Sequence, residues 1–291
     1  MRMRDFLLNL IYMEMKAKDN IFFLTADFGS PVIDKIKYDF PERYINVGIA
    51  EQNLVNVGTG LALEGFCVYL YAIAPFLSLR ALEQIRINLS MLSQLRKLKV
   101  NLISVGGGIS YDISGPTHQC LEDISVINTF PHMEIFIPSD NCTIARFFSY
   151  TLKHGIRYLR LDANLEIDCI ERDFDIKNGF RIIKKGKSAA IITNGYFVKK
   201  ILEFDRDILL IDLFDFHFNR EKLKKVLSYY DRVITIEEGF VGNGIAHEIQ
   251  KIVDNKINSF GLEKKYEFQI GNREEIYERY NLKLEKIIEG I

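Results

Sequence analysis

One glutamate stands where a carboxylate could do chemistry. Glu51 follows a mainly apolar run (44–50) and opens a helical pattern rich in small residues (58–62). A carboxylate at a helix start is stabilised by the helix dipole, typically by about 0.3–1 kcal/mol, so an ordinary N-terminal helix residue is one interpretation. The apolar and small neighbours favour another, in which the carboxylate is partly buried and needs a hydrogen-bond donor.

A glycine-rich stretch, 104–124, contains the second candidate, His118. It follows the strand-like run 100–105, and open parallel sheets bind ligands beyond the carboxyl ends of their strands. Its three consecutive glycines (106–108) permit close backbone approach, but they match neither a dinucleotide fingerprint nor a phosphate-binding P-loop. His118 therefore either supports the loop or projects into the crevice.

A third stretch, 74–86, places the aromatic Phe76 beside a helix that carries Arg80 and Arg86. Taken alone, it is typical of a packed helix start with exposed arginines. No spacing indicates a Ser–His–Asp set or a metal cluster. The four cysteines include no CxxC pair, so we expect neither a zinc site nor a disulfide frame but reduced, mostly buried thiols.

Strand-like runs alternate with helical patterns along the chain. The first series of strands is expected at 21–26, 44–47, 67–71, 100–105, 134–138 and 157–161, with helices at 51–64, 78–95, 120–129 and 140–153. A second series of strands is expected at 189–193, 208–212 and 232–238, with helices at 195–204, 219–228 and 244–254. Alternation of this kind favours parallel sheets flanked by helices. We therefore predict an α/β protein of two domains, 1–170 and 171–291, with a linker over 165–187.

Composition excludes several classes of partner. The formal net charge of −1 argues against a nucleic-acid partner. No run approaches the ~18 apolar residues of a membrane span, and the N-terminal stretch 1–15 reads as an amphipathic helix rather than a signal peptide. We expect a cytoplasmic protein with no membrane contact.

Taken together, these stretches resemble the C-terminal half of transketolases, and most closely the separately encoded C-terminal subunit of split transketolases. The segments "LTADFGSP", "FPERYINVGIAEQN", "APFLSLRALEQIR", "GGGISYDISGPTHQCLEDI" and "IFIPSDN" follow the order of that family's pyrimidine-binding domain. The segments "TIEEGFVGNGIAHEI", "FGL" and "GNREEIYERYNL" resemble its smaller C-terminal domain. The pairing of "GIAEQN" with a downstream "GPTHQ" is the most specific part of the resemblance.

The resemblance implies thiamine diphosphate as the cofactor. In the family, the glutamate of "GIAEQN", here Glu51, hydrogen-bonds N1′ of the aminopyrimidine ring and promotes loss of the proton from thiazolium C2. Phe76 is the best match for the aromatic ring that packs on the aminopyrimidine, and Tyr71 is the alternative. Arg80 is grouped with these cofactor-binding residues. His118 resembles the histidine that faces the substrate and handles its hydroxyl protons.

The resemblance also implies a partner. Complete family members hold the diphosphate through Mg²⁺ or Ca²⁺ with a "GDG…N" motif, which this sequence lacks. We therefore expect an N-terminal transketolase subunit that carries the diphosphate-binding domain and the metal. The assembly would contain two copies of each chain (α2β2, with self-association), no metal would be held by this chain, and this chain alone would be inactive.

Three departures from the family pattern concern the substrate. Gly106 replaces a histidine of "SHGG", Ser114 replaces the aspartate of "DGPTHQ", and Ala163 replaces the second arginine of "IRLxR". The first and third remove groups that help to hold a substrate phosphate in the family, so we expect an atypical sugar on at least one side of the reaction. Arg160 remains, either as a substrate contact or as part of a structural ion pair.

Three functions stay open on the sequence. The first is a ketol-transferring subunit. The second is another thiamine enzyme, such as a 2-oxo acid decarboxylating E1 β-subunit or a deoxyxylulose-phosphate-type synthase; "GPTHQ" disfavours the E1 β-subunit. The third is a non-catalytic partner subunit, which Glu51 and His118 argue against and the three departures support.

Overall fold

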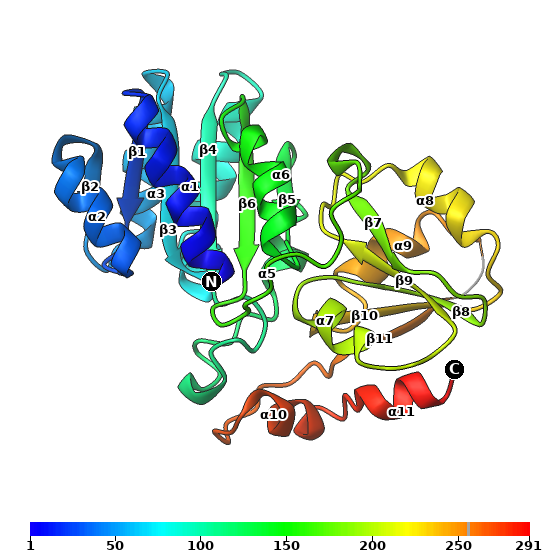
Figure 1. Ribbon diagram of the computed structural model, residues 1–291. Coiled ribbons are helices and arrows are strands. Elements are labelled where there is room, and N and C mark those ends of the chain that lie inside the picture. Colours follow the sequence, from blue (N-terminus) through cyan, green and yellow to red (C-terminus); the bar gives the residue numbers. More distant parts are fainter. Residues whose placement is uncertain (255–256) are drawn as a thin grey trace.

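The computed structural model describes residues 1–254 and 257–291 and contains two β-sheets, each flanked by helices. Figure 1 shows the two sheets side by side, with the last helices running beneath the second one. The predicted α/β class with two mostly parallel sheets is confirmed.

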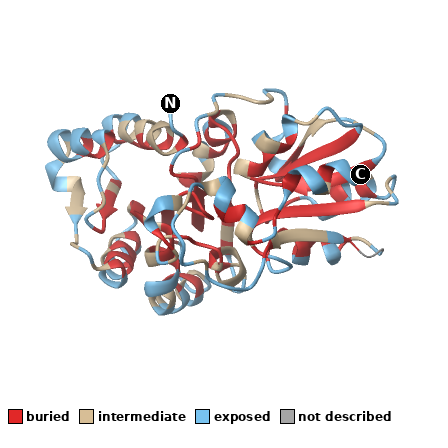
Figure 2. Ribbon diagram, turned by 90° about the horizontal axis from the view of Figure 1, so that it is seen from below, coloured by how far each residue is buried: buried red, intermediate tan, exposed pale blue. Residues whose placement is uncertain are grey.

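The first sheet is parallel throughout. Its strands follow the order β2-β1-β3-β4-β6-β5. They are β1 (Ile21–Thr25), β2 (Tyr44–Asn46), β3 (Cys67–Ile73), β4 (Lys99–Val105), β5 (Met133–Phe136) and β6 (Gly155–Leu161). The inner strands are apolar on both faces because helices cover both, as expected for a parallel sheet. Figure 2 shows these strands as a buried layer between helices with exposed outer faces.

Helices pack on both faces of this sheet. They are α1 (Met3–Ala17), α2 (Pro31–Asp39), α3 (Glu51–Leu63), α4 (Leu82–Gln84), α5 (Asp123–Ile127) and α6 (Asn141–Thr151). The helices α1, α2 and α6 share a core with Tyr69 and Tyr71 of β3, whereas α3 shares its core with Leu70 and Ala72. Since side chains alternate along a strand, α3 lies on the opposite face of the sheet.

The second sheet has one antiparallel edge. Its strands follow the order β11-β10-β8-β9-β7, and only β7 runs antiparallel to its neighbour. The strands are β7 (Phe180–Lys184), β8 (Ala189–Thr193), β9 (Ile208–Leu213), β10 (Val233–Phe240) and β11 (Asn258–Leu262). The helices are α7 (Tyr196–Leu202), α8 (Arg220–Leu227), α9 (Ile245–Gln250), α10 (Arg273–Arg279) and α11 (Leu284–Glu289).

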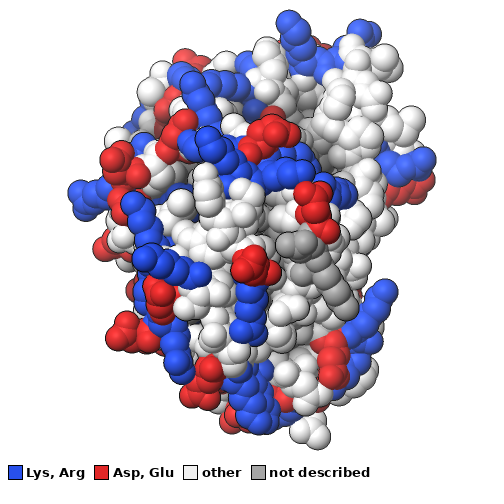
Figure 3. Space-filling view, turned by 90° about the vertical axis from the view of Figure 1, so that its right-hand side faces the viewer, with Lys and Arg blue, Asp and Glu red and all other residues white. Residues whose placement is uncertain are grey.

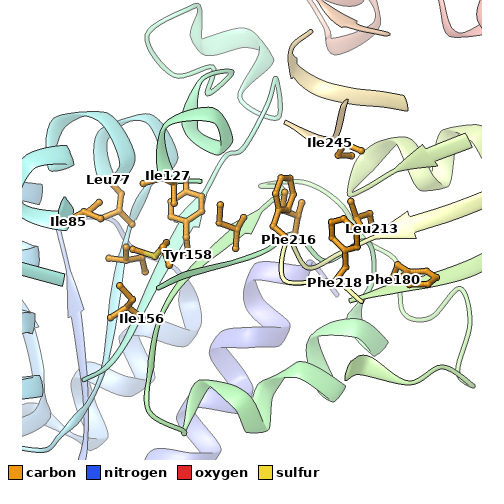
Figure 4. Packing of buried hydrophobic residues seen from close by; sticks show 14 of the residues in the cluster. Leu77, Ile85, Ile127, Ile156, Tyr158, Phe180, Leu213, Phe216, Phe218 and Ile245 are labelled. Atoms are coloured by element: carbon orange, nitrogen blue, oxygen red, sulfur yellow. The ribbon is translucent and has the colours of Figure 1, made fainter. Parts of the chain in front are cut away.

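The two sheets share one continuous core. Figure 4 shows Leu77, Ile127 and Tyr158 of the first half leading to Phe216 and Leu213 of the second, and all belong to one buried cluster. Backbone hydrogen bonds join the same region: the amide of Ile137 donates to the carbonyl of Phe214, and the amide of Phe216 donates to the carbonyl of Ile135. The predicted boundary at 170/171 falls between the sheets, yet the halves are packed as one body.

Several local predictions need correction. The helix predicted at 78–95 is broken into a π-helical segment (Phe76–Arg80), the short α4 and a second π-helical segment (Ile85–Met91). The linker predicted at 165–187 contains a strand, β7, which forms the antiparallel edge. The helix predicted at 140–153 is α6 (Asn141–Thr151), and its N-cap is Asp140, whose carboxylate accepts a hydrogen bond from the amide of Thr143 at 2.8 Å.

The expectation of four reduced cysteines is wrong. Cys142, at the start of α6, forms a disulfide with Cys169 in the segment that leads to the second sheet. The two are 27 residues apart in sequence and carry no motif, so spacing offered no signal; only the fold brings their Cα atoms within 5.1 Å. Cys67 and Cys120 are buried free thiols. The cytoplasmic location stays a prediction, and a disulfide is uncommon in that compartment.

Within the residues that the structure describes, none of the helices is both long and apolar enough to cross a lipid bilayer. The face seen in Figure 3 carries basic and acidic side chains intermingled, with no extended patch of one sign. This mixed surface agrees with the near-zero net charge of the chain.

Candidate cofactor and substrate site

The predicted site residues gather at the carboxyl ends of the first sheet. Glu51 is the first residue of α3, just after β2, and Phe76 follows β3. His118 lies in the long connection after β4, which projects below the sheet in Figure 1. Because parallel strands end at the same edge, these three side chains come together although 67 residues of sequence separate the first from the last.

Glu51 is buried: only 2% of its surface is exposed. Its Oε2 accepts a hydrogen bond from Nη1 of Arg80 at 2.6 Å, a short charge-assisted contact. No donor in the described part of the chain forms a hydrogen bond with the other carboxylate oxygen, Oε1 of Glu51. A buried carboxylate with one oxygen still able to accept is suited to holding a polar ligand group.

An aromatic and an imidazole ring lie next to this carboxylate. The rings of Phe76 and His118 meet edge to face, with centroids 5.2 Å apart. Cζ of Arg80 lies 4.5 Å from the centroid of Phe76, so one arginine links the aromatic ring to Glu51. His118 is only partly buried, and its Nδ1 lies 3.1 Å from the hydroxyl of Thr117. The structure thus brings Glu51, Phe76, Arg80 and His118 into one group.

Tyr71 does not join this group. Its side chain is fully buried on the sheet face opposite α3 and stacks on Phe28, with centroids 4.9 Å apart. Burial raises the pKa of its hydroxyl, and that hydroxyl has no hydrogen-bond partner among the described residues. The choice left open between two aromatic rings therefore falls to Phe76.

At each of the three glycines of the loop after β4, a side chain would collide with a different neighbouring residue. Gly106 has φ +97°, and a Cβ there would lie 2.1 Å from the ring of Tyr111. A Cβ at Gly107 would lie 2.7 Å from the Arg160 side chain, and one at Gly108 would lie 2.1 Å from the carboxylate of Glu238. The glycines therefore serve close packing within this chain, including contact with the second sheet.

Arg160 belongs to that packing. Its Nε donates to Asp123 at 2.8 Å, and its Nη2 donates to the carbonyls of Cys120 and Glu238 at 3.0 and 3.1 Å. The guanidinium is 7% exposed. Burial opposes its charge, but the Asp123 carboxylate together with Cys120, Glu238 and Tyr158 outweighs burial and raises the pKa of Arg160. These contacts favour the structural ion pair over a substrate contact.

The role of Arg273, at the start of α10, was not predicted from the sequence. It donates to Asp162 at 2.6 Å and to both oxygens of Glu238, and its backbone amide donates to Asp112 at 3.1 Å. Two consecutive glutamates in the apolar strand β10, Glu237 and Glu238, indicated that a buried cation was needed. Nothing in the sequence around Arg273 indicated that it is this cation. This arginine ties the second domain to the loop that carries His118.

Ser114 and Ala163, the other two departures from the family pattern, lie in different surroundings. Ser114 is exposed at the end of a 3-10 turn (Asp112–Ser114). Ala163 is 2% exposed, and its amide donates to the hydroxyl of Ser110 at 3.3 Å. Ser114 is therefore accessible to a ligand, whereas Ala163 is part of the core beneath the loop.

The group formed by Glu51, Phe76, Arg80 and His118 fits an aminopyrimidine ring. The carboxylate supplies an acceptor for a ring nitrogen, and the aromatic ring supplies an apolar face. The described residues form no cluster of His, Cys, Asp or Glu able to hold a metal ion.

Fold and site together define an α/β protein with a ligand site at the carboxyl edge of a parallel six-stranded sheet. Residues 1–164, more than half of the chain, match the family described as "Transketolase, pyrimidine binding domain". The chain belongs to this transketolase family.

Two similar proteins are named as transketolase subunits, while 1-deoxy-D-xylulose-5-phosphate synthases are similar as well, among them that of Thermotoga maritima, 28% identical over 77% of this chain and 38% of the relative. A subunit of the apulose-4-phosphate transketolase of Actinobacillus succinogenes is 28% identical over 225 residues, which is 74% of this chain and 71% of the relative. The "6-deoxy-6-sulfo-D-fructose transketolase subunit SqwH" of a Clostridium species is 27% identical over 205 residues, 69% of this chain and 62% of the relative.

A solved structure agrees in fold over the whole chain. "Split gene transketolase, inactive beta4 tetramer" superposes with a TM-score of 0.80 at 24% identity. The match covers 99% of this chain and 96% of that one. The two proteins therefore share the same fold over nearly their whole length.

Proposed function

We propose that this chain is the C-terminal subunit of a split transketolase that moves a two-carbon ketol unit from a ketose to an aldose. The family implies thiamine diphosphate, which supplies an electron sink for cleavage of the ketose carbon–carbon bond. The observation that carries the proposal is the buried carboxylate of Glu51, with one oxygen able to accept, beside Phe76 and His118.

Each residue has a distinct proposed role. Glu51 accepts a hydrogen bond from ring nitrogen N1′ through Oε1, while Arg80 holds Oε2 in place. Phe76 packs on the aminopyrimidine face. His118, partly exposed at the mouth of the site, exchanges a proton with a substrate hydroxyl, and Ser114 and the loop at Gly106 face the sugar.

We propose a partner subunit for the remaining half of the site. It would hold the diphosphate and Mg²⁺ or Ca²⁺, in an assembly of two copies of each chain located in the cytoplasm. The relatives that are named as subunits support a separate partner.

We propose an atypical sugar as one substrate. Two of the relatives are named for apulose 4-phosphate and for 6-deoxy-6-sulfo-D-fructose. Gly106 and Ala163 stand where the family carries phosphate-holding groups. The ring of Tyr111 fills the space beside Gly106 where the family's histidine side chain would begin.

The alternatives are less well supported. A 2-oxo acid E1 β-subunit or a deoxyxylulose-phosphate-type synthase would use the same Glu51, but the two relatives from Actinobacillus and Clostridium are named transketolase subunits. A non-catalytic subunit has no need for a buried glutamate with a free acceptor oxygen. Retention of the group around Glu51 therefore favours catalysis.

The central test replaces Glu51 in the reconstituted enzyme. The chain is co-expressed with an N-terminal transketolase subunit that carries the "GDG…N" motif, and ketol transfer is assayed with a panel of ketoses and aldoses. Glu51→Gln keeps the shape but cannot support the proton shift at N1′, so we expect kcat to fall by about 10²-fold or more. Glu64→Gln, an exposed residue at the other end of α3, is the matched control and should keep full activity.

Two further measurements address the partner and the substrate. Calorimetry should show tight, metal-dependent binding of thiamine diphosphate only when both chains are present; tight binding to this chain alone would contradict the shared site. Comparison of kcat/KM for xylulose 5-phosphate and for unphosphorylated, sulfonated or nucleotide-linked sugars tests substrate choice. Two lost charge-assisted contacts predict roughly two to four orders of magnitude against the common sugar phosphate.

A further inference from the structure

A cavity of about 780 Å³ opens at the amino ends of the first sheet. Its walls come from residues 93–98 before β4, from the first residues of β5 and β6, and from α6. Segments 176–177 and 215–217 close it from the second domain. A seven-residue strand such as β4 is about 20 Å long, so this cavity is separate from the site around Glu51.

Cations without an ion-pair partner line this cavity. Arg96, Lys97 and Lys177 are exposed at its rim, and none of them forms an ion pair with another residue that the structure describes. Three of the chain's five histidines, His132, His154 and His217, also line it. These side chains come from five separate segments of the sequence, so the fold and not a local run of basic residues brings them together.

The two lining carboxylates already have partners. Glu134 pairs with the buried guanidinium of Arg157 at 2.7 Å. Asp215 accepts the backbone amide of His217 at 2.8 Å, and the ring of that histidine lies 3.9 Å away. Neither carboxylate neutralises the three rim cations, so the rim carries an unbalanced positive charge that favours an anionic ligand.

The inner wall is apolar and aromatic. Phe147 and Tyr150 of α6 stack with their planes 10° apart, and Leu98 and Ile156 complete the wall. Opposite them, His132 has a φ of +65°, a conformation uncommon for residues other than glycine. Such backbone strain clusters at ligand sites. The volume lies within the range of about 300–1,000 Å³ that is usual for small-molecule pockets.

We propose that this cavity binds a small organic phosphate. The phosphate contacts Arg96, Lys97 and Lys177 at the rim, because lysine and arginine side chains are the usual hydrogen-bond donors to a bound phosphate. An uncharged ring portion of the ligand packs on Tyr150. Because the site needs neither thiamine diphosphate nor the partner subunit, it can be tested independently of the proposed function.

The test titrates the full chain with ADP by calorimetry at low ionic strength, with inorganic pyrophosphate and adenosine as separate arms. We expect ADP to bind with a Kd below about 1 mM, and pyrophosphate to bind more weakly because it lacks the ring. Lys97→Gln with Lys177→Gln should weaken ADP binding by about tenfold or more, since two charge-assisted contacts are lost. Tyr150→Ala should weaken ADP but not pyrophosphate.

Lys35→Gln is the matched control, because it removes an exposed lysine of α2 far from the cavity walls. It should leave ADP binding unchanged, and circular dichroism should show that all variants stay folded. Failure of both ADP and pyrophosphate to bind at about 10 mM would overturn the site. ADP binding that is equal in the double lysine variant and the wild type would place the ligand elsewhere and overturn it as well.

Discussion

Arg273 offers the sharpest test of how the two domains are held together. Its guanidinium is 11% exposed and lies 2.6 Å from a carboxylate oxygen of Asp162 and 2.5 Å from one of Glu238. The hydroxyl of Tyr277 contacts the same carboxylate of Glu238. Arg273→Met keeps most of the side-chain volume but leaves two carboxylates, each 7% exposed, without their cation.

The expected cost follows from that burial. Removing one partner of a buried ion pair is destabilising by about 3–5 kcal/mol, because the remaining charge is left uncompensated. For a chain of this size, about 2 °C of Tm corresponds to each kcal/mol. We therefore expect Arg273→Met to lower Tm by about 6–10 °C.

Differential scanning calorimetry of the full chain measures this change. Lys224→Met is the control, because Lys224 forms an exposed pair with Asp254 at 3.7 Å, and such pairs contribute about 1 kcal/mol or less. Its Tm should move by about 2 °C or less. If both variants shift Tm equally, Arg273 does not hold the two domains as a buried pair and the argument fails.

Three other expectations are open to simple measurement. Hydrogen bonds from Lys251, Arg220 and Asn128 outweigh burial and lower the pKa of Glu248 to about 2. The stability that the ionised Glu248 contributes is therefore present above about pH 4.5 and is lost as the pH falls toward 2. In acid denaturation, the wild type should lose more stability over that range than Glu248→Gln. Thiol titration of the unfolded, unreduced chain should find two free thiols, because the other two cysteines are paired; four would refute the pairing, and loss of the bridge should cost about 3 kcal/mol. Gly60→Ala, in open space on α3, should stabilise by up to about 1 kcal/mol, whereas Gly58→Ala should gain less because its Cβ would meet Leu70 at 2.5 Å; equal melting temperatures would contradict the contact.

Much of the fold could be predicted because its signals are local. Short apolar runs alternate with helical patterns, and this alternation indicated most of the strands and the parallel order. The strand β7 (Phe180–Lys184) was missed since Arg181 and Lys184 interrupt its apolar pattern, although Arg181 is in fact buried in ion pairs with Asp140 and Asp212. The helix near residues 78–95 carries a helical pattern, but sequence periodicity does not separate a π-helical segment from an α-helix.

A site residue could be predicted where it lies within a recognisable sequence motif. Glu51 and His118 stand in such motifs, and the topology brings them together at one edge. Arg273 could not be foreseen, because its partners are more than 30 residues away in sequence and lie in both domains. Arg160 stood in a recognisable motif, yet its role depends on the buried Asp123, which the motif does not include.

The contact between Gly106 and Tyr111 constrains how this enzyme can change its substrate. A histidine introduced at position 106 would meet the tyrosine ring and a positive φ at once, so that single replacement is expected to damage the loop before it adds a phosphate contact. Replacement of Tyr111 by a small residue would have to come first, and alone it would leave a void. Any route to a histidine at position 106 therefore passes through a poorer intermediate, and the two positions should change as a pair in laboratory evolution.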